Sequence, residues 1–420
     1  MEITDPIFVH AADLHLGAPL KSIGKALNPR HKQELVESVR KAFNNLIDAT
    51  IRLNAEFIVL AGDIYDEADR VASAQFDFYN GLKKLVENRI GVYIVHGNHD
   101  PLTNDVQSVV NLPEEVVVFK SGSVTEIFHK LRDGSEVLIA GISFGKQHEN
   151  ENLALKFRGI QPKHARAVIG LLHTNVGGVS GHDNYAPCSE NDLKGSAVDY
   201  WALGHVHQRT IGELGSNRFW AYPGNLHGRH DREQGEKGAL IIPILKKGVG
   251  KPQFIPLHEF SFKTITVDCT KLTGIEEVAE IIKTELKKNS LDKKVILTVK
   301  LEGRSRLYDV VKSIEDDKKK NQESIEASLE NMIGVTEDQV LIEKIVSSLL
   351  PDIELGALTM ADDLLGDLLT NLKYVTRNDL TARDNGEHNL ILTEEEFISL
   401  KNQMQCDFVD DFLSASDGQA

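Results

Sequence analysis

Cysteine is scarce in this chain: Cys188, Cys269 and Cys406 are the three present, far apart among 420 residues. No two of them form a C-x-x-C pair, so the sequence supports neither a disulfide framework nor a cysteine zinc site, and it favours a reducing compartment. The chain also lacks a long apolar run, and its first residues are acidic. We therefore expect no signal peptide and no membrane span, and we place the protein in the cytoplasm.

An excess of basic residues is missing too, since the net charge is −16. The region from Glu315 to the end carries all of it, with 24 acidic and 8 basic residues, whereas the first 314 residues hold 39 of each sign. Overall acidity argues weakly against nucleic-acid binding. A neutral enzyme body that carries an acidic C-terminal region weakens this objection, and bound metal dications would weaken it further.

Short apolar runs alternate with helical patterns over the first 210 residues. The predicted strands span residues 7–12, 57–61, 92–95, 137–140, 167–172 and 200–203, and the first two helices span 30–53 and 71–89. This β-α-β-α-β order indicates an α/β fold with parallel strands and helices on both faces.

The pattern changes near Phe262. A strand, a helix near 274–289 and a second strand predict a small α+β unit, and the chain beyond Glu315 is acidic and predicted to be mainly helical. We therefore divide the chain into an enzyme domain at 1–258, a cap domain at 259–314 and an acidic helical region at 315–420.

Five polar clusters directly follow predicted strands. They are Asp13-Leu14-His15, Gly62-Asp63, Gly97-Asn98-His99-Asp100, His173 and Gly204-His205-Val206-His207. In open α/β sheets ligands bind outside the carboxyl ends of the strands, so these clusters are expected to converge on one edge. Asp, His and Asn supply the oxygen and imidazole donors that suit manganese, iron or zinc. One bridging carboxylate and about seven ligands in total suit two ions about 4 Å apart.

Each cluster has an ordinary explanation when it is taken alone. An isolated D-x-H pair is usually part of a polar surface, a lone G-D is a turn, and G-H-V-H is also found as a strand end with two unremarkable histidines. The metal prediction depends on the whole set, because all five clusters occur in one order and each follows an apolar run.

The five clusters resemble the motifs of the calcineurin-like metallophosphoesterases, which are D-x-H, G-D, G-N-H-D/E, a single H and G-H-x-H. The resemblance implies a β-sandwich flanked by helices, with two divalent metal ions. By position, one metal would take Asp13, His15, Asp63 and His207, and the other would take Asp63, Asn98, His173 and His205. His99 would stabilise the transition state or protonate the leaving oxygen, and Asp100 would orient His99.

Neighbouring residues narrow the resemblance. The runs 13–17, 62–66 and 222–229 are similar to SbcD-type DNA-repair nucleases, especially the YhaO-like branch. The resemblance implies a manganese-dependent DNA exonuclease and endonuclease that works with an SMC-like, SbcC-type ATPase, and it also implies a homodimer. Because the chain has no G-x-x-x-x-G-K-[ST] motif, the ATPase must be a different chain.

Several basic residues are candidates for neutralising DNA phosphates. They are Arg229, Lys287, Lys288, Lys293, Lys294 and Arg304. For the lysines a solvated face of the cap is an equal alternative, and Arg229 could instead brace its turn.

The acidic region also carries apolar stripes. One stripe consists of Leu364, Leu365, Leu368, Leu369 and Leu372. A further helix is predicted to begin at a capping box formed by Thr393 and Glu396. These helices either pack on the body of the protein or bind a partner helix. Two further functions stay open: a phosphodiesterase for small molecules such as cyclic nucleotides, which the long C-terminal extension disfavours, and a scaffold, which the complete ligand set disfavours.

Overall fold

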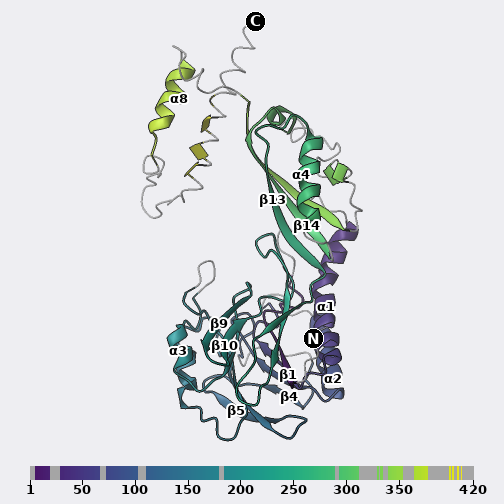
Figure 1. Ribbon diagram of the computed structural model, residues 1–420, viewed down its shortest axis with the longest axis vertical. Helices are drawn as coiled ribbons and strands as arrows, with labels where there is room; N and C mark the ends of the chain where they lie inside the picture. The colour runs from purple at the N-terminus through teal and green to yellow at the C-terminus, as the bar shows by residue number, and fades with distance from the viewer. Residues whose placement is uncertain are drawn as a thin grey trace. The chain divides into compact units, whose positions relative to one another are not determined.

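The computed structural model of the protein describes residues 5–18, 29–66, 72–102, 110–178, 184–288, 293–311, 339–352 and 364–376, with short pieces within 329–333 and 397–408. The chain forms two compact units (Figure 1). The first consists of Met1–Lys263 with Asp292–Ile296, and the second of Thr264–Leu291 with Leu297–Ala420. The domain limits predicted at residues 258 and 314 remain our proposal.

The first unit contains two six-stranded sheets, and the first sheet is mainly parallel. Its strands are β1 (Ile7–Ala11), β2 (Phe57–Ala61), β3 (Gly91–Val95), β4 (Val116–Val118), β11 (Gly238–Pro243) and β12 (Gln253–Pro256). They lie in the order β12-β11-β1-β2-β3-β4, with β1 to β4 parallel and β11 antiparallel to both of its neighbours. Helices α1 (Pro29–Arg52) and α2 (Ala72–Glu87) connect the first three strands, as the sequence predicted.

The second sheet repeats this arrangement with a parallel centre. Its strands are β5 (Thr125–Lys130), β6 (Glu136–Ile142), β7 (Val168–His173), β8 (Tyr200–Gly204), β9 (Thr210–Gly215) and β10 (Arg218–Tyr222). They lie in the order β5-β6-β7-β8-β10-β9, and only the two edge strands are antiparallel to their neighbours. A 3-10 helix, η2 (Leu153–Gly159), and the short helix α3 (Glu190–Lys194) belong to this side of the unit.

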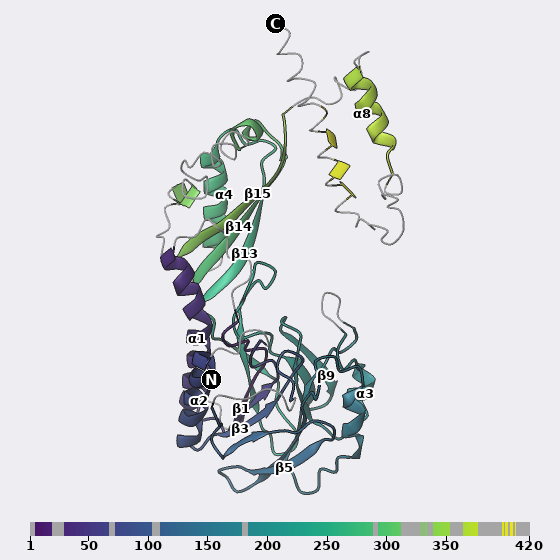
Figure 2. The ribbon, with the colours of Figure 1, turned by 180° about the vertical axis from the view of Figure 1, so that it is seen from behind.

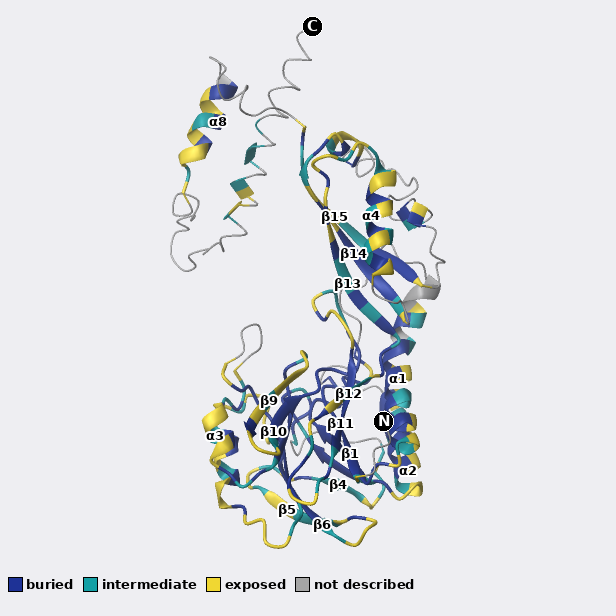
Figure 3. Cartoon of the chain, in the orientation of Figure 1, coloured by how far each residue is buried: buried dark blue, intermediate teal, exposed yellow. Residues whose placement is uncertain are grey.

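Buried apolar side chains form three clusters around these sheets. Figure 3 shows that the central strands consist mainly of buried residues. Between the sheets, Phe8 stacks on Phe57 with ring centroids 4.8 Å apart, and Tyr200 of the other sheet meets Phe8 edge to face. The outer face of the first sheet is covered by α1 and α2, which lie side by side along it (Figure 2). The outer face of the second sheet packs against η2 and α3 through residues such as Phe157 and Trp201. The predicted β-sandwich flanked by helices is thus confirmed.

The second unit contains a three-stranded sheet with the order β13-β14-β15. Its elements are β13 (Phe260–Asp268), α4 (Ile275–Lys287), β14 (Lys294–Arg304), β15 (Val340–Leu350) and α8 (Leu364–Tyr374). Strand β15 falls in the region that we expected to be mainly helical, so that region contributes to the sheet of the cap as well as forming helix α8. The cause is local, because Val340–Leu350 is rich in β-branched residues that favour strands, although the surrounding chain is acidic. Within the described residues no helix has the length and apolar character needed to cross a membrane.

Candidate metal centre

The strand ends that carry the five polar clusters meet at one edge of the sandwich. Within the first sheet, Ala11 pairs with Leu60 and Ala61 pairs with Val95, so the carboxyl ends of β1, β2 and β3 are level. In the second sheet, His173 at the end of β7 pairs with Gly204 at the end of β8. A hydrogen bond joins the two edges, because Nδ1 of His173 lies 2.9 Å from the carbonyl oxygen of Ala61.

The chain turns sharply where each strand ends. Asp13, His15, Asp63 and His205 have φ angles of 52°, 45°, 50° and 104°, which non-glycine residues adopt at a cost. Such conformations persist when the surrounding structure enforces them, and they cluster at functional sites. Here backbone hydrogen bonds enforce them, since the amides of Asp13 and His15 donate to the carbonyls of Gly62 and Asp63 at 3.1 and 3.0 Å.

Two glycines leave space for the side chains of this edge. A Cβ atom at Gly62 would lie 2.4 Å from Nδ1 of His173, and one at Gly97 would lie 2.3 Å from Oδ1 of Asp63. No real Cβ contact is that short, so only glycine at these two positions lets His173 and Asp63 approach each other.

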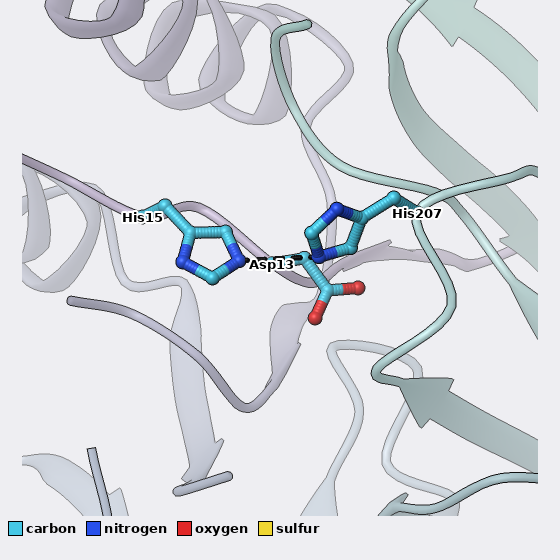
Figure 4. Close-up of side chains that lie close together, drawn as sticks. All are labelled: Asp13, His15 and His207. Atoms are coloured by element: carbon cyan, nitrogen blue, oxygen red, sulfur yellow. Dashed lines mark hydrogen bonds between the residues drawn. The ribbon is translucent and has the colours of Figure 1, made fainter. Parts of the chain in front are cut away.

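One half of the site contains His15, His207 and Asp13, whose ligand atoms lie within 4.8 Å of one another (Figure 4). Nδ1 of His15 lies 2.7 Å from Asp66, and Nδ1 of His207 lies 2.6 Å from Glu233. Burial lowers the pKa of both imidazoles, which favours the neutral form of each ring. A carboxylate only accepts, so each neutral ring carries its hydrogen on Nδ1 and leaves a lone pair on Nε2.

These two lone pairs point at each other, since the Nε2 atoms of His15 and His207 are 3.2 Å apart. Two neutral rings with their hydrogens on Nδ1 cannot hydrogen-bond through these atoms, whereas a cation that both nitrogens ligate can hold them at this separation. Donors about 2.1 Å from one metal and at right angles lie about 3 Å apart. The donor set of this half therefore fits a metal ion.

The other half contains His173, Asp63 and Asn98. Nδ1 of His173 donates to the Ala61 carbonyl, and its Nε2 lies 3.4 Å from Oδ2 of Asp63 and 3.0 Å from Oδ1 of Asn98. Burial alone would lower the pKa of His173, but the Asp63 carboxylate raises it to about 9. A dication bound by the same three donors would replace that proton.

Asp63 faces both halves of the site. Its Oδ2 lies 3.4 Å from Nε2 of His173 and 4.0 Å from Nε2 of His15. Burial alone would raise its pKa, but the imidazoles of His173, His15 and His99 lower it well below the usual range. An ionised carboxylate between two imidazole groups is the arrangement expected of a bridging ligand.

His205 completes the predicted ligand set. Its ring lies beside that of His173, with centroids 5.2 Å apart, and its backbone amide donates to the Asp13 carboxylate at 3.0 and 3.2 Å. Burial raises the pKa of Asp13 to about 6. A nearby dication would favour the ionised form of this carboxyl group. The fold thus brings together all seven residues predicted as ligands.

The sequence of residues 7–209 matches the family model described as calcineurin-like phosphoesterase. The chain is 34% identical over 290 residues to the metallophosphoesterase YhaO of Bacillus subtilis, a match that covers 68% of this chain and 69% of the relative. This chain belongs to the calcineurin-like phosphoesterase family. It is a metal-binding hydrolase of a family that holds a dinuclear metal centre.

This phosphoesterase also has more distant relatives whose names state the process in which they act. The DNA double-strand break repair protein Mre11 of Sulfurisphaera tokodaii is 25% identical over 303 residues, covering 71% of this chain and 73% of the relative. The protein of the same name from Archaeoglobus fulgidus is 26% identical over 317 residues, covering 70% and 68%.

The partner of His99 in this phosphoesterase differs from the prediction. Nδ1 of His99 lies 3.0 Å from Oδ1 of Asp66, and this hydrogen bond raises the pKa of the imidazole. Asp100, which we expected to orient His99, instead accepts from the amides of Gly97 and Ile64 at 2.9 and 2.8 Å. It also lies 3.1 Å from Nδ1 of His96. The side chain of Asp100 is turned into its own loop, where it accepts hydrogen bonds from these amides. The carboxylate that orients His99 is therefore that of Asp66.

Glu233 is a functional residue that sequence reasoning missed. Besides His207, it binds the amide of Arg229 at 2.7 Å and the side chain of Asn225 at 2.8 Å. The guanidinium of Arg229 spans both outer carboxylates, 3.3 Å from Asp66 and 3.6 Å from Glu233. The sole signal in the sequence was proximity: Asp66 ends the 62–66 run, and Glu233 follows the 222–229 run.

The other residues predicted to contact DNA lie in or near the cap and have local partners. Lys288 pairs with Glu285 of its own helix, Lys293 lies 3.9 Å from Glu259, and Lys294 lies 2.9 Å from Glu34. Arg304 donates to the carbonyl of Pro351 at 3.4 Å. Lys287 is exposed at the end of α4. These contacts fit the solvated-face alternative, and DNA contact by these five residues remains a prediction.

Proposed function

We propose that this phosphoesterase is a DNA nuclease that uses two manganese ions. The observation that carries the proposal is the set of seven buried or half-buried donors at one sheet edge, in which two imidazole lone pairs face each other at 3.2 Å. The choice of DNA is supported by the relatives named as double-strand break repair proteins. When bound, two such ions polarise a phosphodiester and stabilise charge on the attacking and leaving oxygens.

The roles that we propose for the ligands follow the two halves of the site. Asp13, His15 and His207 would hold one ion, and Asn98, His173 and His205 would hold the other, with Asp63 shared. Outside this set, Asp66 and Glu233 fix the ring orientation of His15 and His207 and increase their basicity as ligands.

His99 is the side chain that we propose as proton donor. Its hydrogen bond to Asp66 favours the imidazolium form, and 39% of its side chain is exposed, so we propose that Nε2 meets the substrate. A protonated imidazole there can donate to the oxygen that leaves the phosphorus, which is the role of a general acid.

The proposal is tested with the purified chain and end-labelled single- and double-stranded oligonucleotides in manganese, magnesium or chelator. We expect metal-dependent cleavage that the chelator stops and that identically purified Asp63→Ala lacks, which excludes a contaminating nuclease. Cyclic nucleotides and bis(p-nitrophenyl) phosphate are included as small substrates. Hydrolysis of these with none of DNA would replace our proposal with the small-molecule alternative.

We also propose that the nuclease acts with an SMC-like ATPase, in line with the family resemblance. The apolar stripe of α8 offers limited support, because Leu365, Leu369 and Leu372 are buried in the chain itself while Leu368 and Tyr374 are exposed. The predicted capping box of Thr393 and Glu396 lies outside the described residues. Co-purification of the full chain with such an ATPase tests this partner. A homodimer and a cytoplasmic location likewise remain predictions.

A further inference from the structure

A pocket of about 500 Å³ adjoins the metal centre on the side of His207. Its wall contains that ligand together with side chains of the loop that follows β10, among them Arg229, His230, Arg232 and Glu233. The volume is in the range of sites that hold a small molecule or one unit of a polymer. Because one metal ligand lines the pocket, whatever occupies it lies next to the reacting phosphate.

The charges that line this pocket are mainly positive. Arg229, Arg232 and Lys237 stand against one carboxylate, that of Glu233. Two of these cations are already bound within the protein. Arg229 forms ion pairs with Asp66 and Glu233, and the ammonium group of Lys237 donates to the His207 carbonyl at 3.0 Å.

Arg232 differs from both. Its side chain is exposed, and among the described residues no carboxylate pairs with its guanidinium group. A planar guanidinium that is free to form two parallel hydrogen bonds is suited to a phosphate.

The loop that carries Arg232 is held by its own hydrogen bonds. The amide of Arg232 donates to Nδ1 of His230 at 3.2 Å, and the amide of Glu233 donates to the carbonyl of His230 at 3.0 Å. Since Glu233 in turn holds His207, the same short segment fixes a metal ligand and presents a free cation. Little conformational entropy of the backbone remains to be lost when an anion binds there.

We propose that this pocket is the subsite for the nucleotide next to the scissile phosphodiester, with Arg232 binding the phosphate of that nucleotide. The inference rests on the proposed nuclease function and deepens it, because a phosphate-specific subsite selects a polynucleotide over a single phosphodiester. A substrate with one phosphate satisfies the metal centre and leaves Arg232 without a ligand.

The test measures binding of the metal-loaded full chain to a fluorescent single-stranded oligonucleotide whose phosphorothioate linkages resist cleavage. Affinity is followed by anisotropy from about 50 to 200 mM salt. Arg232→Ala should lower affinity about tenfold at low salt. It should also lower the slope of log K against log salt by about 0.7, the value of one phosphate contact on a single strand.

Two further variants serve as controls. Arg232→Lys keeps the charge and should keep the salt slope. Arg52→Ala removes an equal charge from the exposed end of α1, and it should change neither the slope nor the cleavage of DNA. A slope for Arg232→Ala equal to that of the unmodified chain, in a protein that binds and cleaves DNA, would overturn the subsite alone. A chain that neither binds nor cleaves DNA would overturn the nuclease proposal together with it.

Discussion

Two buried histidines in the first unit behave in opposite ways. His173, at the metal edge, is fully buried, and the carboxylate beside it raises its pKa to about 9. His10, in the interior of the sandwich, is equally buried, but burial lowers its pKa to about 3. The polar side-chain partner of His10 is the neutral hydroxyl of Tyr200, 2.8 Å from Nδ1.

Because His173 and His10 are equally buried, the side chains beside them decide the direction in which each pKa is shifted. The Asp63 carboxylate beside His173 favours positive charge there, whether that charge is a proton or a metal ion. An imidazole among apolar side chains stays neutral and serves as a link between the two sheets. The following predictions test this contrast, beginning with the largest expected effect.

Removing the shared carboxylate should have the largest effect. Asp63→Ala takes away the negative charge that faces both His15 and His173, so we expect loss of activity and a lower content of both metals. Asp13→Ala should lower the bound metal less. Elemental analysis of the two variants checks this, and full occupancy in Asp63→Ala would show that the carboxylate does not bridge.

The variant His99→Ala should separate chemistry from metal binding. His99 lies beside the ligands, and its hydrogen-bond partner Asp66 is outside the predicted ligand set, so the variant should keep both metals and bind DNA. Its turnover should fall by about 10²–10⁴, the usual contribution of a general acid. Loss of metal from this variant would identify His99 as a ligand.

The variant Glu233→Gln should weaken one half of the centre. The amide can still bond to Asn225, but it cannot supply the negative charge that supports His207 as a ligand. We expect metal affinity to fall about 10–100-fold in a stepwise titration, at one of the two sites. His173 is oriented by the Ala61 carbonyl instead, so the second site should keep its affinity. An equal loss at both sites would contradict the division into halves.

The interior histidine should affect stability at low pH and leave the metal centre unchanged. The folded pKa of His10 is about 3 and the unfolded value is 6.5, so its contribution is present above pH 6.5 and is lost as pH falls from 6.5 toward 3. At pH 5 the free energy of unfolding has lost about 2 kcal/mol of this contribution. His10→Gln does not titrate, so its free energy of unfolding should fall less between pH 7.5 and pH 5. Denaturant unfolding at both pH values measures the difference, and identical losses would show that His10 does not titrate on unfolding.

The sequence allowed the metal edge to be predicted because its ligands are local to strand ends. Apolar runs predicted where β1, β2, β3, β7 and β8 end, and the rule for parallel sheets then gave the meeting point. The strands β4, β5 and β9 to β12 were not predicted, and β9 to β12 follow turns without a helical spacer.

Contacts between distant loops could not be predicted in the same way. Asp66 and Asp100 both follow motif residues closely, and the family resemblance implied Asp100 as the partner of His99. Which carboxylate contacts His99 depends on the direction of each side chain. Asp100 is directed away from His99 because it accepts hydrogen bonds from the amides of Gly97 and Ile64. The contact of Glu233 with His207 likewise requires knowledge of the loop after β10.

The left-handed backbone at Asp13, His15, Asp63 and His205 has a consequence for protein engineering. Glycine or asparagine relieves such a conformation, so a library screened for thermal tolerance alone will enrich those residues there. Each glycine variant would remove a proposed ligand, and each asparagine variant would replace it with a neutral amide. Variants of this chain that are selected for heat resistance should therefore lose activity unless every round of selection also requires phosphodiester cleavage.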